Sequence, residues 1–429
     1  MSIAVLSIVI LGICVVLWVT EAIPLVTTAV LGCVLMSVFN VAKFSEIWGG
    51  FASDTVWLVI GMVTLGNAMF ATGAAQMIGR GIIKVAGTNE RTLLIVSMAV
   101  AAVISAFLSN TATVAMFIAI FTGLIATNPH LKMKNLLMPV GLAAVAGGVC
   151  TLVGSTPQVV AQGILEKQLG KGFGMFDFTP VGAPIVVVMI LFVVLIGYPL
   201  GKKIWGGEQQ AVETTEVAKT ETVATDAAPQ NMTKIYIVLA IFALTVFGFV
   251  QGFFSVGLTC MIAGTACVLF RCIPQKEVFE KMDWNAVGVL GGALGIAEGL
   301  SKSGGGKMIA DAFIGLVGTD ASAFIIFAAL VFICMALTQF MSNTATVAML
   351  VPIALFICAD MGFNPYAFAM GLIVAANMSF ATPVATTPLT MTLVAGYKFM
   401  DYVKVGGAFN IVCYFLVIGI VPIFFPLLL

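Results

Sequence analysis

The sequence has little charge and almost no histidine. Only 9% of its 429 residues are charged, its formal net charge is zero, and it contains one histidine. Soluble domains carry roughly a quarter charged residues, so this composition excludes an ordinary soluble protein. A chain without net positive charge also gives no reason to expect nucleic acid as a partner.

The nine cysteines offer no metal or redox site. They are spread singly through apolar runs, and no two of them form a Cys-x-x-Cys pair. We therefore interpret them as small core residues. With one histidine and no paired acid and base at membrane depth, an integral-membrane enzyme would lack the groups for hydrolysis or redox chemistry. We predict that the chain is not an enzyme and has no catalytic residues.

What the sequence does have is long hydrophobic runs. Hydrophobic residues make up 61% of the chain, and its mean hydropathy is +1.14. Runs of about 17–25 residues, each long enough to cross a bilayer, recur along it. The first run lacks a basic n-region and a clear cleavage site, so we interpret it as a membrane helix and not a signal peptide. We predict an all-α membrane protein with about ten spans, at 2–22, 24–41, 54–72, 136–165, 180–201, 234–251, 254–271, 284–301, 364–397 and 404–427.

Two further apolar regions, 92–127 and 321–359, contain the same octapeptide, SNTATVAM. Its two copies begin at Ser109 and Ser342. Three consecutive hydrogen-bonding side chains would be costly in a helix that faces lipid, whereas a tip buried in protein avoids that cost. We therefore predict that each region is a re-entrant hairpin with the octapeptide at its tip.

Basic residues predict the orientation. With the N-terminus outside, most of the 19 Lys and Arg residues fall in inner connections, and the outer ones hold Lys43, Lys167, Lys171, Lys302 and Lys307. This is a positive-inside bias, and counting either hairpin as a full span would weaken it. We predict a multi-pass protein of the cell inner (plasma) membrane with both termini outside.

The order of these elements repeats along the chain. Residues 1–205 and 234–429 each contain five spans and one hairpin, and the polar segment 206–233 between them has the composition of a cytoplasmic linker. Because five is odd, the second copy would lie inverted in the membrane. Inverted repeats are typical of secondary transporters, which place substrate at the repeat interface. An ordinary duplicated bundle, in which the polar motifs only join helices, is the alternative.

Further hydroxyl groups precede each octapeptide. Ser105 stands four residues before Ser109, and Thr338 stands four before Ser342. Residues four apart share a helix face, so each hydroxyl would extend its tip by one turn. Hydroxyls, amide oxygens and carbonyls freed at a helix break are suitable ligands for a hard monovalent cation such as sodium.

The spans 136–165 and 364–397 are interrupted by the segments GGVCTLVGSTPQ (147–158) and NMSFATPVATTP (377–388). Proline removes a backbone donor and disrupts the preceding turn. The breaks would expose carbonyls to a cation and helix N-termini to an anion. Neither octapeptide and neither break contains Arg, Lys or His. We predict a neutral pocket in which co-bound cations help to hold a carboxylate.

With these motifs together, the chain resembles the divalent anion/sodium symporter family, the di- and tricarboxylate transporters. The matching pieces are WVTEAIPL (18–25), the paired SNT motifs, GGVCTLVGSTPQ and PVATTP (383–388). The resemblance implies secondary active transport of a di- or tricarboxylate with sodium as the coupling ion. It also implies a homodimer in which a transport domain moves like an elevator against a scaffold domain.

The resemblance further implies the site residues. The first sodium site would use Ser105, Ser109, Asn110 and the Gly154 carbonyl, and the second would use Thr338, the Met341 carbonyl, Asn343 and the Ala385 carbonyl. The substrate would meet Asn110, Thr111, Ser342, Asn343, Thr344 and Thr386. The loops STPQ (155–158) and TTPL (386–389) depart from the Thr-Pro-Pro-Asn that is common in the family, which leaves substrate preference and coupling mode open.

Three functions remain at this point. The leading one is sodium-coupled symport of a C4 dicarboxylate such as succinate or malate, with fumarate, tartrate, citrate, 2-oxoglutarate and sulfate still open. The second is a sodium-independent dicarboxylate exchanger. The third is an anion channel, but a channel needs a continuous pore, whereas two inverted half-sites predict one occluded site.

Overall fold

The computed structural model describes residues 2–78, 81, 87, 89–128, 130–205, 231–318 and 321–429. Within these residues the secondary structure is helical, and the one β-type contact is an antiparallel bridge between Phe363 and Leu428. The predicted all-α class is therefore confirmed. Most of the predicted linker, residues 206–230, lies outside the described residues. Of its last three residues, Asn231 caps α13, and Met232 and Thr233 are the first residues of that helix.

The first part of the chain forms α1 (Ile3–Thr20), α2 (Leu25–Val38), α3 (Phe44–Trp48), η1 (Gly49–Ala52), α4 (Asp54–Ala71), α6 (Glu90–Ser105), α7 (Asn110–Thr127), α8 (Met133–Gly148), α9 (Thr156–Leu169), α10 (Thr179–Phe192), η2 (Val193–Gly197) and α11 (Tyr198–Trp205). The second part forms α13 (Met232–Gln251), α14 (Val256–Leu269), α15 (Gln275–Glu280), α16 (Trp284–Ser303), α17 (Gly305–Val317), α18 (Ala323–Leu337), α19 (Asn343–Met361), α20 (Pro365–Asn377), α21 (Thr387–Thr392), η3 (Leu393–Ala395) and α22 (Phe399–Phe424).

Seven helical stretches of the described chain are long and apolar enough to cross a membrane, and α2, α14, α18 and α20 are shorter apolar helices. Helices lie at each of the ten predicted spans. By length and composition the chain is therefore a multi-pass membrane protein.

Both long predicted spans are split into two helices. The gap after α8 covers 149–155 and the gap after α20 covers 378–386. Pro157 and Pro388 stand in the first turn of the helix that follows each gap, where the missing N–H of proline costs no hydrogen bond. The breaks were predicted from these prolines and their polar neighbours.

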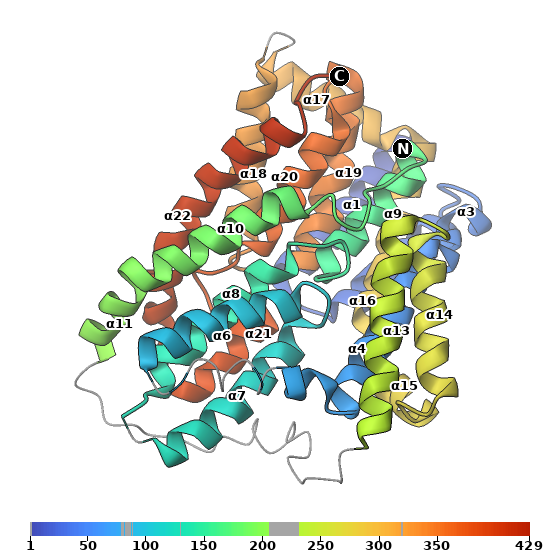
Figure 1. Ribbon diagram of the computed structural model, residues 1–429. Helices are drawn as coiled ribbons and strands as arrows, with labels where there is room; N and C mark the ends of the chain where they lie inside the picture. The colour runs from blue at the N-terminus through green and yellow to red at the C-terminus, as the bar shows by residue number, and fades with distance from the viewer. Residues whose placement is uncertain are drawn as a thin grey trace.

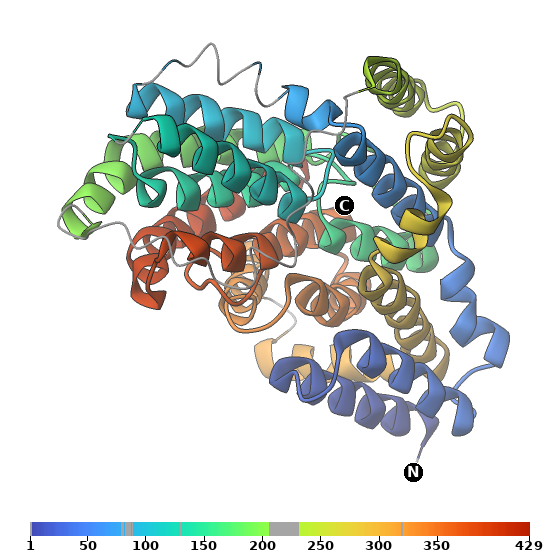
Figure 2. The ribbon, with the colours of Figure 1, turned by 90° about the horizontal axis from the view of Figure 1, so that it is seen from below.

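The helices sort into two groups (Figures 1 and 2). Helices α1–α4 pack with α13, α14 and α16, whereas α6–α8, α10 and α11 belong with α18 and α20–α22. Figure 2 shows α1 and α2 in dark blue on the opposite side of the molecule from α6–α8 in lighter blue and teal. Helices α9 and α19 contact members of both groups, whereas α17 packs against α1 and α16 of the first group and against α19.

Three central helices, α8, α16 and α20, have most of their residues buried. They are rich in Gly and Ala, and small residues let helix backbones approach closely where lipid gives no hydrophobic driving force. Gly147 of α8 is an example, because a Cβ atom there would collide with the backbone of Ala102 in α6. This close packing fixes α6, and with it the first octapeptide, against the first helix break.

Candidate functional site

At the first octapeptide the chain passes from α6 to α7. Ser105, the last residue of α6, is fully buried, and its hydroxyl donates to Oδ1 of Asn110, the first residue of α7. Ser109 caps α7 and accepts a hydrogen bond from the Ala112 N–H at 3.4 Å. Asn110 and its neighbour Thr111 are half-buried. The Ser105 hydroxyl and the Asn110 amide thus meet at the tip, while Ser109 is exposed and bonded to its own helix.

The first helix break lies directly against this tip. A Cβ atom at Gly148 would stand 2.6 Å from Asn110 Oδ1 and 3.0 Å from the Gly154 carbonyl oxygen. A Cβ atom at Gly154 would stand 2.8 Å from the Ala106 carbonyl oxygen. Only glycine allows the backbones and the amide to come this close. The structure therefore brings together Ser105, Asn110 and Gly154, three of the four residues predicted for the first ion site.

The second octapeptide has the same central contact. Thr338 is fully buried, and its Oγ1 lies 2.8 Å from Asn343 Oδ1 and 2.6 Å from the Ala376 carbonyl oxygen. A hydroxyl has one proton and can donate it to only one of these oxygens at a time. Three oxygen atoms therefore converge on a buried point with few protons to share, which suits a cation.

A second contact is also made twice. The Thr151 hydroxyl in the first break donates to the carbonyl of Ala106, which directly follows Ser105. The Thr382 hydroxyl in the second break donates at 2.7 Å to the carbonyl of Gln339, which directly follows Thr338. Each break is thus tied to its own tip by a threonine in the same place.

The remaining predicted residues lie around the second tip and break. Met341 is buried immediately before the octapeptide, and Ser342 and Thr344 are half-buried within it. Ala385 and Thr386 are half-buried at the end of the second break. Thr386 precedes α21 in an extended conformation, and its side chain makes no capping bond to that helix. Its hydroxyl is therefore not used to end the break.

The two halves interleave. Helix α9, which follows the first break, packs against α19, which carries the second octapeptide. Helix α21, which follows the second break, packs against α7 and α8 beside the first octapeptide. The helix that follows each break thus packs against the helix that carries the octapeptide of the other half.

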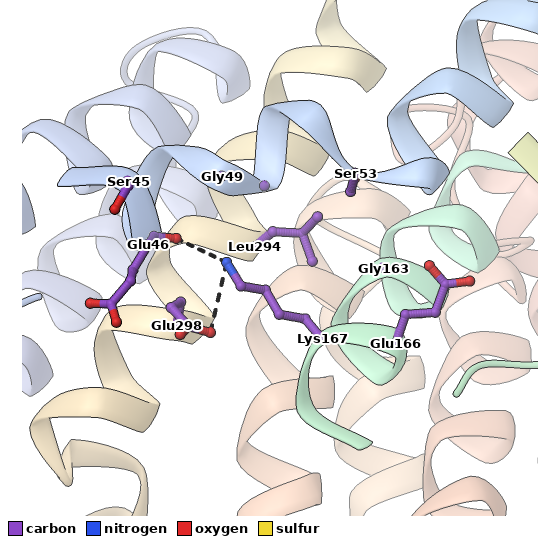
Figure 3. A pocket seen from close by; sticks show the side chains of 10 residues that line it. Ser45, Glu46, Gly49, Ser53, Gly163, Glu166, Lys167, Leu294 and Glu298 are labelled. Carbon is purple, nitrogen blue, oxygen red and sulfur yellow. Dashed lines mark hydrogen bonds and ion pairs between the residues drawn. The ribbon is translucent and has the colours of Figure 1, made fainter. Parts of the chain in front are cut away.

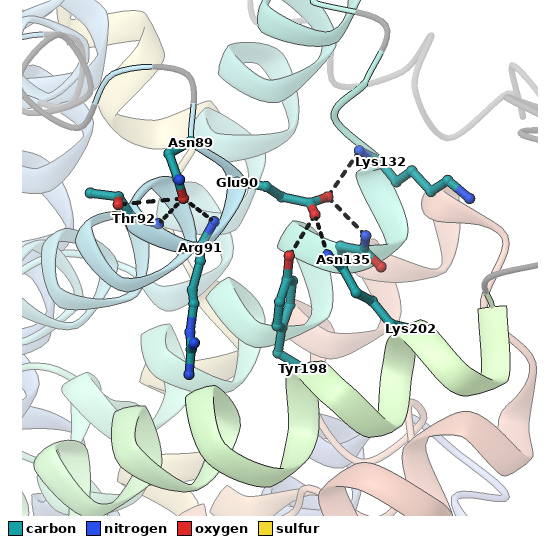
Figure 4. Close-up of polar contacts among 8 residues, drawn as sticks. All are labelled: Asn89, Glu90, Arg91, Thr92, Lys132, Asn135, Tyr198 and Lys202. Atoms are coloured by element: carbon teal, nitrogen blue, oxygen red, sulfur yellow. Dashed lines mark hydrogen bonds and ion pairs between the residues drawn. The ribbon is translucent and has the colours of Figure 1, made fainter.

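A cluster of charged and polar groups lies at the start of α6, at the end of this helix opposite Ser105. Glu90, the first residue of α6, accepts hydrogen bonds from the Tyr198 hydroxyl at 2.6 Å and the Asn135 amide at 2.8 Å, and Lys202 Nζ lies 3.4 Å away (Figure 4). Burial raises the pKa of Glu90, but these hydrogen bonds, one from the Lys132 N–H and the Lys202 charge outweigh it and hold the pKa below its ordinary value. This ionised carboxylate joins the start of α6 to α8 and α11.

A second polar region is a cavity of about 350 Å³ between α3, α9 and α16 (Figure 3). Lys167 Nζ lies 3.7 Å from Glu298 Oε2 and donates to the Glu46 carbonyl at 3.0 Å. Lys302, four residues after Glu298 on the same helix, also lies 3.8 Å from it. The contacts of Lys167 could not be predicted from spacing, because its partners lie on other helices. These charges pair with each other and belong to none of the predicted site residues.

The comparison with family models decides the class of protein. The model described as citrate transporter matches residues 15–355, more than three quarters of the chain. The chain belongs to the citrate transporter family. It is a secondary transporter and a multi-pass membrane protein, and the prediction that it is not an enzyme is confirmed.

Three similar proteins are named as transporters, and each matches this chain over most of its own length. An uncharacterized transporter of Haemophilus influenzae is 27% identical over 426 residues, covering 93% of this chain and 87% of that protein. The sodium-dependent dicarboxylate transporter SdcS of Staphylococcus saprophyticus is 26% identical over 403 residues, covering 86% of this chain and 76% of that protein. The SdcS of Staphylococcus aureus strain MRSA252 is 24% identical over 440 residues, covering 96% and 84%.

Two solved structures share the fold. MtrF of Neisseria gonorrhoeae aligns with a TM-score of 0.62 at 12% identity, covering 100% of this chain and 96% of that chain. YdaH of Alcanivorax borkumensis aligns with a TM-score of 0.58 at 11% identity, covering 89% and 87%. MtrF belongs to a class of antimetabolite efflux pumps and YdaH is a transporter, and at such low identity the two structures show the fold alone.

Proposed function

We propose that this citrate-family transporter carries a C4 dicarboxylate, such as succinate or malate, together with sodium. The observation that carries the proposal is the pair of uncharged oxygen clusters, Ser105 with Asn110 and Thr338 with Asn343, each set against a helix break. The names of the SdcS relatives, sodium-dependent dicarboxylate transporters, point in the same direction.

The absence of charge from the predicted residues explains why cations would travel with the substrate. A dicarboxylate in a buried neutral pocket would lose much of its hydration without gaining an opposite charge. Sodium ions held by hydroxyl, amide and carbonyl oxygens would supply that charge. They would also leave with the substrate, so that the empty pocket contains no fixed cation to retain the anion.

The proposed ligands follow the two tips and breaks. We assign one sodium to Ser105, Ser109, Asn110 and the Gly154 carbonyl, and a second to Thr338, Asn343 and the carbonyls of Met341 and Ala385. We assign the substrate carboxylates to Asn110, Thr111, Ser342, Asn343, Thr344 and Thr386. Ser109 Oγ accepts one hydrogen bond from the Ala112 N–H and keeps a second lone pair, which could bind an ion.

The proposal includes an inverted-repeat topology. Residues 1–205 and 234–429 would be the two repeats, joined by a cytoplasmic linker at 206–233, with re-entrant hairpins at 92–127 and 321–359. The recurring contacts of Thr151 and Thr382 support a repeated unit. In this topology both termini face outward from the cell inner membrane.

We further propose an elevator motion in a homodimer. Helices α6–α11 with α18–α22 would move as the transport domain, and α1–α4 with α13–α17 would remain as the scaffold. The two helix groups of the fold support this division. The pair formed by Lys167 and Glu298 then lies across the boundary, joining α9 to α16.

Uptake of labelled succinate into proteoliposomes, with and without an inward sodium gradient, tests the function. Symport predicts accumulation that requires the gradient and proceeds without internal dicarboxylate. Uptake that ignores sodium but requires internal dicarboxylate would instead identify an exchanger. Single-channel currents would contradict both carrier mechanisms.

A further inference from the structure

A buried bridge joins the two helix breaks. Asn377, the last residue of α20, is fully buried. Its Oδ1 accepts a hydrogen bond from the Ser155 hydroxyl at 2.8 Å, and its Nδ2 donates to Gln158 Oε1 at 3.2 Å. Ser155 and Gln158 flank the start of α9, so a side chain from the second half of the protein holds the helix that follows the first break.

Gln158 passes this contact on to the backbone of the first break. It is fully buried, and its Nε2 donates to the Gly148 carbonyl at 2.7 Å. That carbonyl ends α8 and lacks its usual helical donor, because the Leu152 N–H bonds to the Met175 carbonyl at 3.0 Å instead. Gly148 in turn lies against the Asn110 amide. One side chain therefore separates Asn377 from the backbone that shapes the first tip.

At its other end the bridge reaches the second tip. Asn377 directly follows Ala376, whose carbonyl lies 2.6 Å from the Thr338 hydroxyl beside Asn343. A continuous run of contacts thus connects the asparagines of the two octapeptides. Its two central side chains, Gln158 and Asn377, are outside the predicted ligand sets.

We propose that Gln158 and Asn377 are positioning residues that fix the shape of the first sodium site from the second half of the chain. The proposal rests on the proposed sodium-coupled function and adds a role for two residues that contact neither ion nor substrate. The Gln158 amide fixes the orientation of the Gly148 carbonyl, and the Asn377 amide fixes Gln158. Through Gly148 the two amides hold the Asn110 amide in its place. Removing either amide would loosen the first site even though every ligand remains.

Three variants test this: Gln158→Leu, Asn377→Leu and the double substitution. Removing one partner of a buried hydrogen bond leaves the other unsatisfied, whereas replacing both by apolar groups can be nearly neutral. The single variants should lower the melting temperature, and the double variant should recover part of that loss. If a single variant fails to fold, the double variant still carries the test.

The decisive readout is the sodium concentration that gives half-maximal succinate uptake. We expect each single variant to raise it roughly tenfold, the effect of one lost hydrogen bond to a positioned group. Because the two side chains act through one run of contacts, the double variant should show about the same rise and not the product of the two. The succinate KM at saturating sodium should change by less than about twofold, because bound sodium would hold Asn110 in place and every substrate ligand is still present.

Thr245→Val is the matched control. Thr245 is buried in α13, and its hydroxyl bonds only to Ile241 of the same helix, at 2.7 Å. This control should keep the wild-type sodium dependence. The inference is wrong if the sodium requirement of the double variant equals that of the wild type, or if the two single shifts multiply. Wild-type uptake that is indifferent to sodium would overturn the proposed function and this inference together.

Discussion

The two tips share an identical octapeptide and the same hydroxyl–amide contact, but different amide side chains bond the backbone of their helix breaks. In the second region the buried Gln339 donates to the carbonyls of Met335 and Met378 at 2.8 and 2.9 Å and accepts from the Ala381 N–H at 3.0 Å. The residue at the matching place in the first region is Ala106, which has no polar side chain.

In the first region, a side chain outside the tip supplies the amide that bonds to the backbone at the break. Gln158 comes from α9 and depends on Asn377 of the other half for its orientation. The amide that bonds the second break therefore comes from its own tip, whereas the amide that bonds the first break comes from α9 and is held by a residue of the other half of the chain. The first tip is also the more open one, because Asn110 is half-buried and Asn343 is buried. Identical octapeptides do not make identical sites.

The largest expected effect comes from removing either tip asparagine. We predict that Asn110→Ala and Asn343→Ala each reduce succinate uptake by at least about 100-fold, because each would lose an amide that we propose binds both an ion and the substrate. The measurement is initial uptake in proteoliposomes at matched protein levels. Asn128→Ala is the control, since the Asn128 amide bonds only within its own helix end. Wild-type uptake in both tip variants would show that the pocket lies elsewhere.

The next prediction compares how much Gln339 and Gln158 each contribute to stability. Gln339→Leu removes three hydrogen bonds and leaves buried backbone groups without partners, so we expect a loss of about 2–3 kcal/mol in stability. Gln158→Leu should cost less, because its Nε2 contact with Thr151 is long, at 3.5 Å. Melting temperatures of the purified variants in detergent compare the two. An equal or larger loss for Gln158→Leu would contradict the ranking.

A third prediction concerns the residues that would offer carbonyls to the ions. Gly154→Ala would place a Cβ atom 2.8 Å from the Ala106 carbonyl oxygen, which is backbone and cannot move aside cheaply. We expect a loss of about 1–3 kcal/mol and a raised sodium requirement. Ala385→Gly at the matching position of the second break removes a methyl group and should have a smaller effect. Sodium titration of uptake for both variants tests this, and a stronger effect of Ala385→Gly would reverse the comparison.

The smallest expected effect concerns the threonine contact that occurs in both regions. Thr151→Val and Thr382→Val each remove one hydroxyl that donates to a carbonyl of the neighbouring tip. Each should lower stability by about 1 kcal/mol, and by similar amounts. Melting temperatures measure this as well. A large difference between the two variants would show that the recurring contacts are not equivalent.

The sequence was sufficient to predict the helix breaks and the tip contacts. Ser105 and Thr338 were selected because i,i+4 spacing would place them on one helix face with Ser109 and Ser342. The structure instead ends a helix at Ser105 and just before Thr338 and starts the next one after each octapeptide serine, and both hydroxyls meet the following asparagine across the turn. The prolines at 157 and 388 located both breaks. These features are local, so residue type and spacing contain the information.

The connections between the breaks could not be predicted. Gln158 was noticed only as a departure from the common loop, and nothing in the sequence links it to Asn377, which lies 219 positions away. The three contacts of Gln339 and the approach of Lys167 to Glu298 likewise depend on how helices pack. Such long-range partners follow from tertiary structure, which spacing along one helix does not encode.

Binding of succinate to the purified protein at different sodium concentrations tests the central claim most directly. The claim is that two uncharged half-sites form one pocket that requires sodium to hold a dicarboxylate. We predict that succinate raises the melting temperature in sodium but not in an equal concentration of choline, and that Asn110→Ala and Asn343→Ala each abolish this rise. Equal stabilisation by succinate in choline, or its persistence in either variant, would contradict the claim.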